Sequence, residues 1–160
     1  MRGLSVDRLS RYHVPFTVVF VALGVAVADS LSKIWARHSL VAGAKHILGP
    51  LWFQLQYNAG LAFSFRGAGT IVTSVIVIVV SVAVLLSGLR ARPGASSWGF
   101  GLLIGGGVAN AIDRFAASPH EVTDFIAVGS FPIFNLADAA ITIGFLVLLV
   151  KLLQGEKLLT

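Results

Sequence analysis

The stretch FNLADAAITIGFLVLLVKLL, at residues 134–153, is apolar over nearly its whole length. A helix needs about 20 mostly apolar residues to cross a bilayer, and the segments at 14–35, 68–89 and 98–115 approach the same length and character. The chain is 56% hydrophobic and only 12% charged, whereas soluble domains hold roughly 25% charged residues. The sequence therefore predicts one integral membrane domain over residues 1–160, built on four transmembrane helices.

The distribution of basic residues predicts how these helices are oriented. Four spans put both chain ends on one side, and seven of the twelve Lys and Arg residues flank that side: Arg2, Arg8, Arg11, Arg90, Arg92, Lys151 and Lys157. Short segments rich in Lys and Arg stay in the cytoplasm, so both termini are predicted to be cytoplasmic. The connections 37–67 and 116–133 then face outward. Aromatic residues in partial alternation at 51–57 predict a short strand or hairpin in the first of them.

The composition argues against several classes of site. There is no cysteine, which excludes disulfides, thiol catalysis and Cys-ligated metals. The net charge of +5 is not arranged as a basic stripe interleaved with aromatics, so nucleic acid is not a predicted partner. The basic excess indicates contact with anionic lipid headgroups instead. The four histidines are scattered, so we expect no metal and no other cofactor, although the pair His120 and Asp124 stays open.

Acidic residues gather at the predicted outer face. Five of the seven in the chain belong to this group: Asp29, Asp113, Glu121, Asp124 and Asp138. An ionisable residue inside a span is costly and marks a functional site by default. Asp29 and Lys33 are four residues apart, so on a helix they share a face and can pair. Asp113 is followed directly by Arg114, which offers it a counter-charge.

Asp124 and Asp138 differ from the other acids because neither has a Lys or Arg within four positions in the sequence. Two carboxylates held close together cannot both ionise readily, so one keeps a proton and the pair can act as acid and base. The ionised member would take a proton from water attacking a carbonyl, and the protonated member would support the oxyanion and then the leaving amine. We interpret the pair as a candidate for hydrolysis.

Five short blocks together resemble the lipoprotein signal peptidase family, signal peptidase II of bacteria. They occur in the family's order, and they read Asp29-Ser-Leu-Ser-Lys33, Asn58-Ala-Gly-Leu-Ala-Phe-Ser64, Gly105-Gly-Gly-Val-Ala-Asn-Ala-Ile-Asp-Arg114, Val122-Thr-Asp-Phe-Ile126 and Pro132-Ile-Phe-Asn-Leu-Ala-Asp-Ala-Ala-Ile141. Each block alone is a weak signal, whereas five in order on the predicted elements make a strong one.

The resemblance implies a mainly α membrane protein with four transmembrane helices and a small extracytoplasmic β-rich subdomain. It implies an aspartyl endopeptidase of the bacterial cytoplasmic membrane, with its active site near the outer face, acting without a cofactor. Diacylglyceryl-modified prolipoproteins would be the substrates, cleaved just before the lipidated Cys, and we expect a monomer surrounded by membrane lipids. The catalytic aspartates of the family fall on Asp124 and Asp138. The supporting polar residues fall on Asp29, Lys33, Asn58, Gly60, Asn110, Asp113, Arg114 and Asn135.

Simpler interpretations apply to some of these residues. Asn135 and Asp138 have the spacing of a helix N-cap and its N3 partner, and Asn58 with Gly60 fits an ordinary turn. A small transporter or ion-conducting protein would also place acids inside spans, although nearer the bilayer centre. A non-catalytic scaffold would bind lipoprotein precursors without turning them over.

Overall fold

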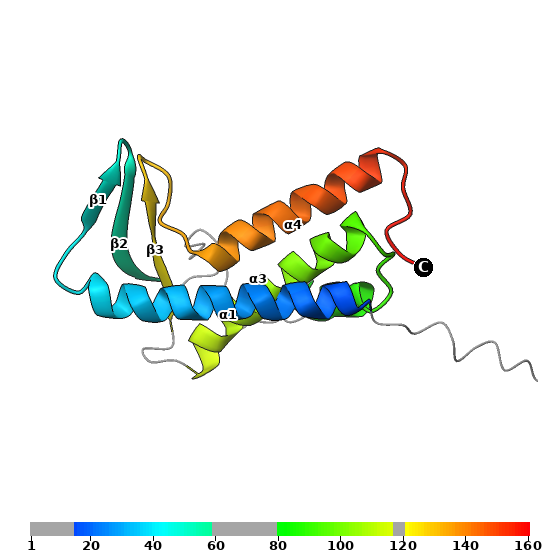
Figure 1. The fold of residues 1–160 in the computed structure, drawn as a ribbon, viewed down its shortest axis with the longest axis horizontal. Helices are drawn as coiled ribbons and strands as arrows, with labels where there is room; N and C mark the ends of the chain where they lie inside the picture. Colours follow the sequence, from blue (N-terminus) through cyan, green and yellow to red (C-terminus); the bar gives the residue numbers. More distant parts are fainter. Residues whose placement is uncertain (1–14, 59–79, 117–120) are drawn as a thin grey trace, which may run out of the picture.

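The computed structural model describes residues 15–58, 80–116 and 121–160, and it is mainly helical with one small sheet (Figure 1). The helices are α1 (Phe16–Ser39), α3 (Ala95–Ala116) and α4 (Leu136–Leu153), and the strands are β1 (Lys45–Leu48), β2 (Leu51–Asn58) and β3 (Val122–Val128). Residues 80–88 are also helical. They are the end of the predicted span at 68–89, the rest of which lies outside the described residues.

Among the described residues, two helices are long and apolar enough to cross a membrane, namely α1 with 24 residues and α4 with 18. They correspond to the first and last predicted spans. Helix α1 continues to Ser39 rather than ending at residue 35, and α4 begins at Leu136 because Asn135 caps it. Helix α3 matches the predicted third segment in position, but it is not one of the two. Four spans therefore remain a prediction.

Helix α3 lies between α1 and α4 and packs closely against both (Figure 1). A Cβ atom on Gly105 would lie 2.6 Å from the carbonyl oxygen of Ala22 in α1, and one on Gly106 would lie 2.5 Å from that of Ala137 in α4. Neither position has room for a side chain. The glycines of this helix thus allow close helix approach, which agrees with the packing role expected of small residues in a membrane protein.

The sheet is antiparallel, in the order β1-β2-β3, and sits at one end of the helices (Figure 1). Strand β2 confirms the strand predicted at 51–57, and its Gln56 is paired with Asp124 of β3. Trp35 of α1 meets Phe53 and Phe125 edge-on, with ring centroids 5.3 and 6.2 Å away. This aromatic contact fixes the sheet against the end of α1, and so fixes the position of Asp124 relative to the helices.

Candidate active site

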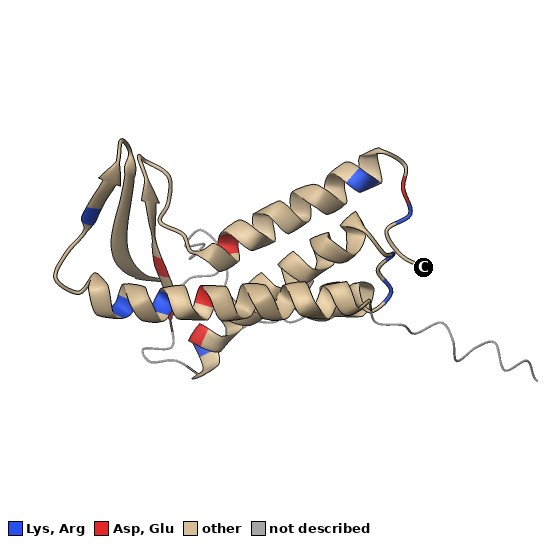
Figure 2. Cartoon of the chain, viewed as in Figure 1, with Lys and Arg blue, Asp and Glu red and all other residues tan. Residues whose placement is uncertain are grey.

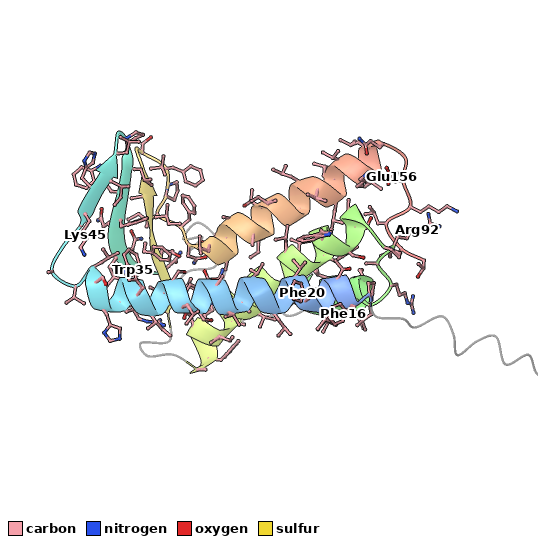
Figure 3. All side chains as sticks on the ribbon, viewed as in Figure 1. Phe16, Phe20, Trp35, Lys45, Arg92 and Glu156 are labelled. Atoms are coloured by element: carbon pink, nitrogen blue, oxygen red, sulfur yellow. The ribbon has the colours of Figure 1, made fainter. Side chains whose placement is uncertain are left out.

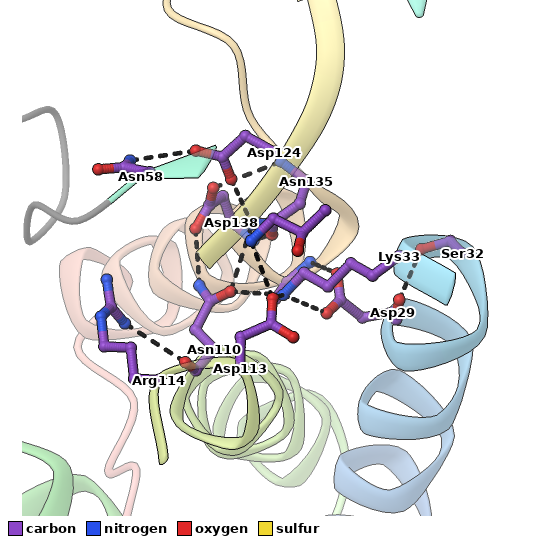
Figure 4. A network of polar contacts seen from close by, with 12 residues as sticks. Asp29, Ser32, Lys33, Asn58, Asn110, Asp113, Arg114, Asp124, Asn135 and Asp138 are labelled. Atoms are coloured by element: carbon purple, nitrogen blue, oxygen red, sulfur yellow. Dashed lines mark hydrogen bonds and ion pairs between the residues drawn. The ribbon is translucent and has the colours of Figure 1, made fainter. Parts of the chain in front are cut away.

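Most of the acidic residues lie where the sheet meets the helices, as predicted from the sequence (Figure 2). Asp29 comes from α1, Asp113 from α3, Asp124 from β3 and Asp138 from the first turn of α4. Figure 4 shows these four side chains and their amide and cationic partners in one connected polar network. Residues from four elements and more than 100 positions apart in sequence thus converge on one place.

Lys33 is the cation at the centre of this network. Its Nζ lies 2.7 Å from Oδ2 of Asp29 and 3.1 Å from Oδ2 of Asp113, and all three side chains are buried. The ammonium also donates to Oδ1 of Asn110 at 2.8 Å. The predicted pairing of Asp29 with Lys33 is confirmed, and one lysine neutralises acids on two different helices. Such a pair is costly to break, because each partner left alone would be a buried charge.

Asp113 has closer cationic partners than the one expected. Arg37 of α1 lies 3.3 Å from its Oδ1 and also donates to Oγ1 of Thr123 at 2.9 Å. The backbone N–H of Thr123 donates to Oδ2 of Asp113 at 2.9 Å. The sequence pointed to Arg114, whose charge does interact with that of Asp113, although its interactions with Asp138 and Asp124 are larger. Lys33 and Arg37 make the close ion pairs, and Asp113 joins α1, α3 and β3.

Two asparagines connect the buried cation to the aspartates of the predicted pair. Asn110 donates from Nδ2 to Oδ1 of Asp138 at 2.8 Å. Asn135 donates from Nδ2 to Oδ1 of Asp124 at 2.7 Å and to Oδ1 of Asn110 at 3.2 Å. Since Oδ1 of Asn110 accepts from both Lys33 and Asn135, its amide orientation is determined by its neighbours. Each asparagine therefore presents an N–H to one carboxylate.

Asn135 and Asp138 also cap α4, as the simpler interpretation proposed. The backbone N–H of Asp138 donates to Oδ1 of Asn135 at 2.9 Å, and the backbone N–H of Asn135 donates to Oδ2 of Asp138 at 3.4 Å. This reciprocal arrangement is a capping box. Capping and contact with Asp124 coexist because different atoms of Asn135 do each: the amide oxygen caps, and the amide nitrogen reaches Asp124.

Asp124 is almost completely buried, whereas Asp138 is half-buried. Burial, with a smaller contribution from the negative charge of Asp138, raises the pKa of the Asp124 carboxyl to about 6 against the opposing effect of hydrogen bonds from Asn58 and Asn135. The Asn58 bond, from Nδ2 to Oδ2 of Asp124, is 3.1 Å long. A carboxyl with a pKa near 6 can hold or release a proton near neutral pH.

The remaining predicted site residues have supporting positions. Asp29 accepts a hydrogen bond from the backbone N–H of Ala137 at 2.8 Å, which places its charge at the positive end of α4. Arg114 donates to the carbonyl oxygen of Asn110 at 3.5 Å. Gly60 lies outside the described residues. Within the described ranges, no three His, Cys, Asp or Glu residues are grouped as metal ligands would be.

Two members of the network were not identified from the sequence. Arg37 and Thr123 are bonded to each other across 86 positions of the chain. A weak signal existed for Arg37, because it is four residues after Lys33 and so lies on the same helix face. No such pattern marked Thr123, whose contacts depend entirely on where β3 packs.

This geometry allows acid–base chemistry by a pair of carboxyl groups. Asn135 contacts both Asp124 and Asp138, which fixes the two relative to each other (Figure 4). A protonated and an anionic carboxyl group held in this way can transfer protons to and from a reacting water and a leaving group. Asp124 is 1% exposed and Asp138 is partly exposed, so Asp138 is the more accessible of the two.

Comparison with known proteins gives a consistent result. The family model for signal peptidase (SPase) II matches residues 21–154. The lipoprotein signal peptidase of Gloeobacter violaceus is 39% identical over 150 residues, which cover 89% of this chain and 84% of that protein. The lipoprotein signal peptidase of Rhodococcus jostii is 33% identical over 150 residues, which cover 86% of this chain and 73% of that protein. A solved bacterial membrane enzyme has a similar fold, with a TM-score of 0.77 at 24% identity over 90% of this chain and 92% of that one.

Proposed function

The chain belongs to the signal peptidase II family, and from this premise we propose that it removes signal peptides from prolipoproteins by means of an Asp124–Asp138 pair. The family makes the chain a peptidase with prolipoprotein substrates. The aspartyl mechanism rests on one observation above the others: Asn135 donates to both carboxylates, through its amide to Asp124 and its backbone N–H to Asp138.

In the proposed reaction Asp124 is the protonated member, because its pKa of about 6 lies well above that of an ordinary aspartate. Asp138 is the base, since it accepts from Asn110 and from the N-cap backbone, and these donors suit an anionic oxygen. Asp138 takes a proton from water while the water oxygen bonds to the scissile carbonyl carbon. Asp124 donates to the oxyanion. The C–N bond then breaks, and the amine of the lipidated Cys leaves with a proton from the pair.

The supporting residues hold this pair without taking part in bond making. Lys33 and Arg37 together neutralise Asp29 and Asp113, so that neither acid adds an uncompensated negative charge beside the catalytic pair. Asn110 links Lys33 to Asp138, because its amide oxygen accepts a hydrogen bond from Lys33 and its amide nitrogen donates one to Asp138. We propose that these residues position the aspartates, and that their replacement lowers the rate without changing which bond is cleaved.

Exposed apolar side chains on the helices support the proposed membrane placement. Large apolar side chains are exposed along α1 and α4, as Phe20, Leu31, Phe145 and Leu146 illustrate at 65%, 62%, 56% and 50% exposure. Lipid would cover these surfaces, and Figure 3 shows such side chains pointing away from the helices. In the proposed orientation both termini are cytoplasmic and the aspartates lie near the outer face. The diacylglyceryl chains of a substrate would then enter from the bilayer while its peptide reaches the site.

Two amide substitutions test the proposal. Asp124→Asn and Asp138→Asn keep shape but remove acid–base capacity, so each should lower cleavage of a diacylglyceryl precursor by about 100-fold or more. Glu121→Gln is the matched control, because Glu121 precedes β3 and makes no contact with the pair among the described residues. Cleavage is followed by the mass loss of the precursor, and thermal unfolding checks folding. Substantial turnover by either Asp variant would disprove the assignment.

A further inference from the structure

A polar cavity lies at the end of the helices opposite the aspartates. Here the first turn of α3, the end of α4 and the chain that follows it enclose a cavity of about 490 Å³. Its polar lining comes from Arg92, Ser96, Lys151, Glu156 and Lys157. Figure 3 labels Arg92 and Glu156 at this end of the molecule, far from Trp35 at the sheet. The proposed peptidase reaction uses none of these residues.

The cavity has a fixed wall rather than a loose tail. After α4 the chain turns back, and the backbone N–H of Arg92 donates to the carbonyl oxygen of Leu158 at 2.9 Å. The backbone N–H of Thr160 donates to the carbonyl oxygen of Arg90 at 2.9 Å, and Ala91 and Leu159 form an antiparallel bridge between these two bonds. Leu158 packs against the buried apolar cluster around Ala91. Backbone hydrogen bonds and apolar burial together hold this segment over the start of α3.

The lining has an excess of positive charge. Three basic side chains face one acid, and that acid, Glu156, is paired with Lys151 at 2.8 Å. In the described part of the chain, no carboxylate forms an ion pair with Arg92 or Lys157. An anion entering the cavity would therefore find two cations at once. A third, Lys151, becomes available if the anion displaces Glu156.

A nearly buried serine and a helix N-terminus point to the same kind of ligand. Ser96 is only 5% exposed and lines the cavity, and among the described residues its hydroxyl donates to no other group. A ligand in the cavity can therefore accept a hydrogen bond from this hydroxyl. Ser96 is in the first turn of α3, where backbone N–H groups lack intrahelical acceptors and favour anions.

We propose that this cavity binds a phosphate group, supplied by the headgroup of an anionic phospholipid. Phosphate suits the lining because it accepts hydrogen bonds from Ser96 and from backbone N–H groups while its charge is met by Arg92 and Lys157. The depth fits a headgroup, since α4 is long enough to span the bilayer and ends at Leu153, just before the cavity. Basic pockets at the ends of spanning helices bind anionic lipid headgroups by the same forces.

The test measures binding to the full chain in neutral detergent. Short-chain phosphatidylglycerol, short-chain phosphatidylcholine and inorganic phosphate are titrated separately, and calorimetry gives each affinity. Phosphatidylglycerol should bind saturably and more tightly than phosphatidylcholine. Inorganic phosphate that competes at the same site, with equal affinity and equal sensitivity to mutation, would support the phosphate site and make free phosphate its ligand.

Four substitutions and one control locate the site. Ser96→Ala should weaken binding by on the order of tenfold, and Arg92→Gln and Lys157→Gln by about fivefold each. Glu156→Gln should tighten binding, because it releases Lys151. Lys45→Gln, on the exposed face of β1 at the other end, should leave affinity unchanged.

The thermal midpoint of Ser96→Ala without ligand gives a second readout. It should not fall, since the hydroxyl has no partner to lose within the described structure. Binding that does not saturate, or that Lys45→Gln weakens as much as Arg92→Gln does, would overturn the proposal in favour of general surface attraction. Because the assay reads binding alone, its outcome does not depend on peptidase activity.

Discussion

Replacing Lys33 by methionine should destabilise the protein more than any other single change to a basic residue in the described network. Methionine has nearly the length of lysine and lacks its charge, so the variant leaves two buried carboxylates without their shared ammonium. Asp113 keeps Arg37 at 3.3 Å. Asp29 keeps only the hydrogen bond from the backbone of Ala137 as a described contact of its carboxylate.

The expected size follows from this imbalance. Breaking a buried ion pair by removing one partner costs about 3–5 kcal/mol, and both Lys33 and Asp29 have zero exposure. Because Arg37 still serves Asp113, the penalty should be close to that of one pair and not of two. Lys33→Met is therefore expected to lower the free energy of unfolding by about 3–5 kcal/mol.

Unfolding in mixed micelles, followed by circular dichroism, measures this loss. The double variant Asp29→Asn with Lys33→Met should recover part of it, because it removes the carboxylate that was left unpaired. Lys45→Met is the control, since Lys45 is exposed on β1 and should change stability by no more than about 0.5 kcal/mol. A loss below about 1 kcal/mol for Lys33→Met, or a double variant less stable than the single one, would refute the reasoning.

Three further predictions concern the site and its supports. The pKa of Asp124 is about 6 in the folded chain against an ordinary value of 3.8, so between these pH values the folded state keeps a proton that the unfolded state releases. The free energy of unfolding should therefore fall by up to about 3 kcal/mol as the pH rises from 3.8 to about 6. Measured by unfolding at a series of pH values, this dependence should be absent in Asp124→Asn. The Asn58 hydrogen bond lowers the same pKa, so Asn58→Ala should move the alkaline limb of the kcat/KM profile to higher pH, and a shift to lower pH would contradict the role of Asp124 as the acid. Gly106→Ala should cost about 1–3 kcal/mol in thermal unfolding because its Cβ would meet the backbone of Ala137, whereas Gly107→Ala, with open space, should be neutral or stabilising by up to about 1 kcal/mol.

The sequence predicted which residues form the site better than it predicted the hydrogen bonds and ion pairs between them. Asp29 and Lys33 could be paired in advance because helical spacing alone places them on one face. The gathering of Asp113, Asp124 and Asp138 followed from where their segments begin and end. These are local properties, so a single sequence carries them.

What could not be predicted depends on contacts between distant segments. Arg37 reaches Asp113 because α3 packs against α1, and it reaches Thr123 because β3 does, and nothing near Arg37 in the sequence encodes either contact. Likewise, the cavity containing Ser96 exists only because the chain after α4 returns to pair with residues 90–92. A serine in the first turn of a glycine-rich helix gives no sign of this.

The unequal heights of the helices have a consequence for the membrane around the protein. The bond from the backbone of Ala137 to Asp29 sets the first turn of α4 level with Asp29, ten residues before α1 ends at Ser39. At 1.5 Å per residue, α1 therefore rises about 15 Å above the aspartates. In the proposed orientation, the depth of Asp124 and Asp138 relative to the end of α1 is set by the protein, while the lipid surface is set by acyl-chain length. Thicker bilayers would then submerge the proposed pair further and thinner ones would bring it toward water, so we expect turnover to depend on the thickness of the host membrane.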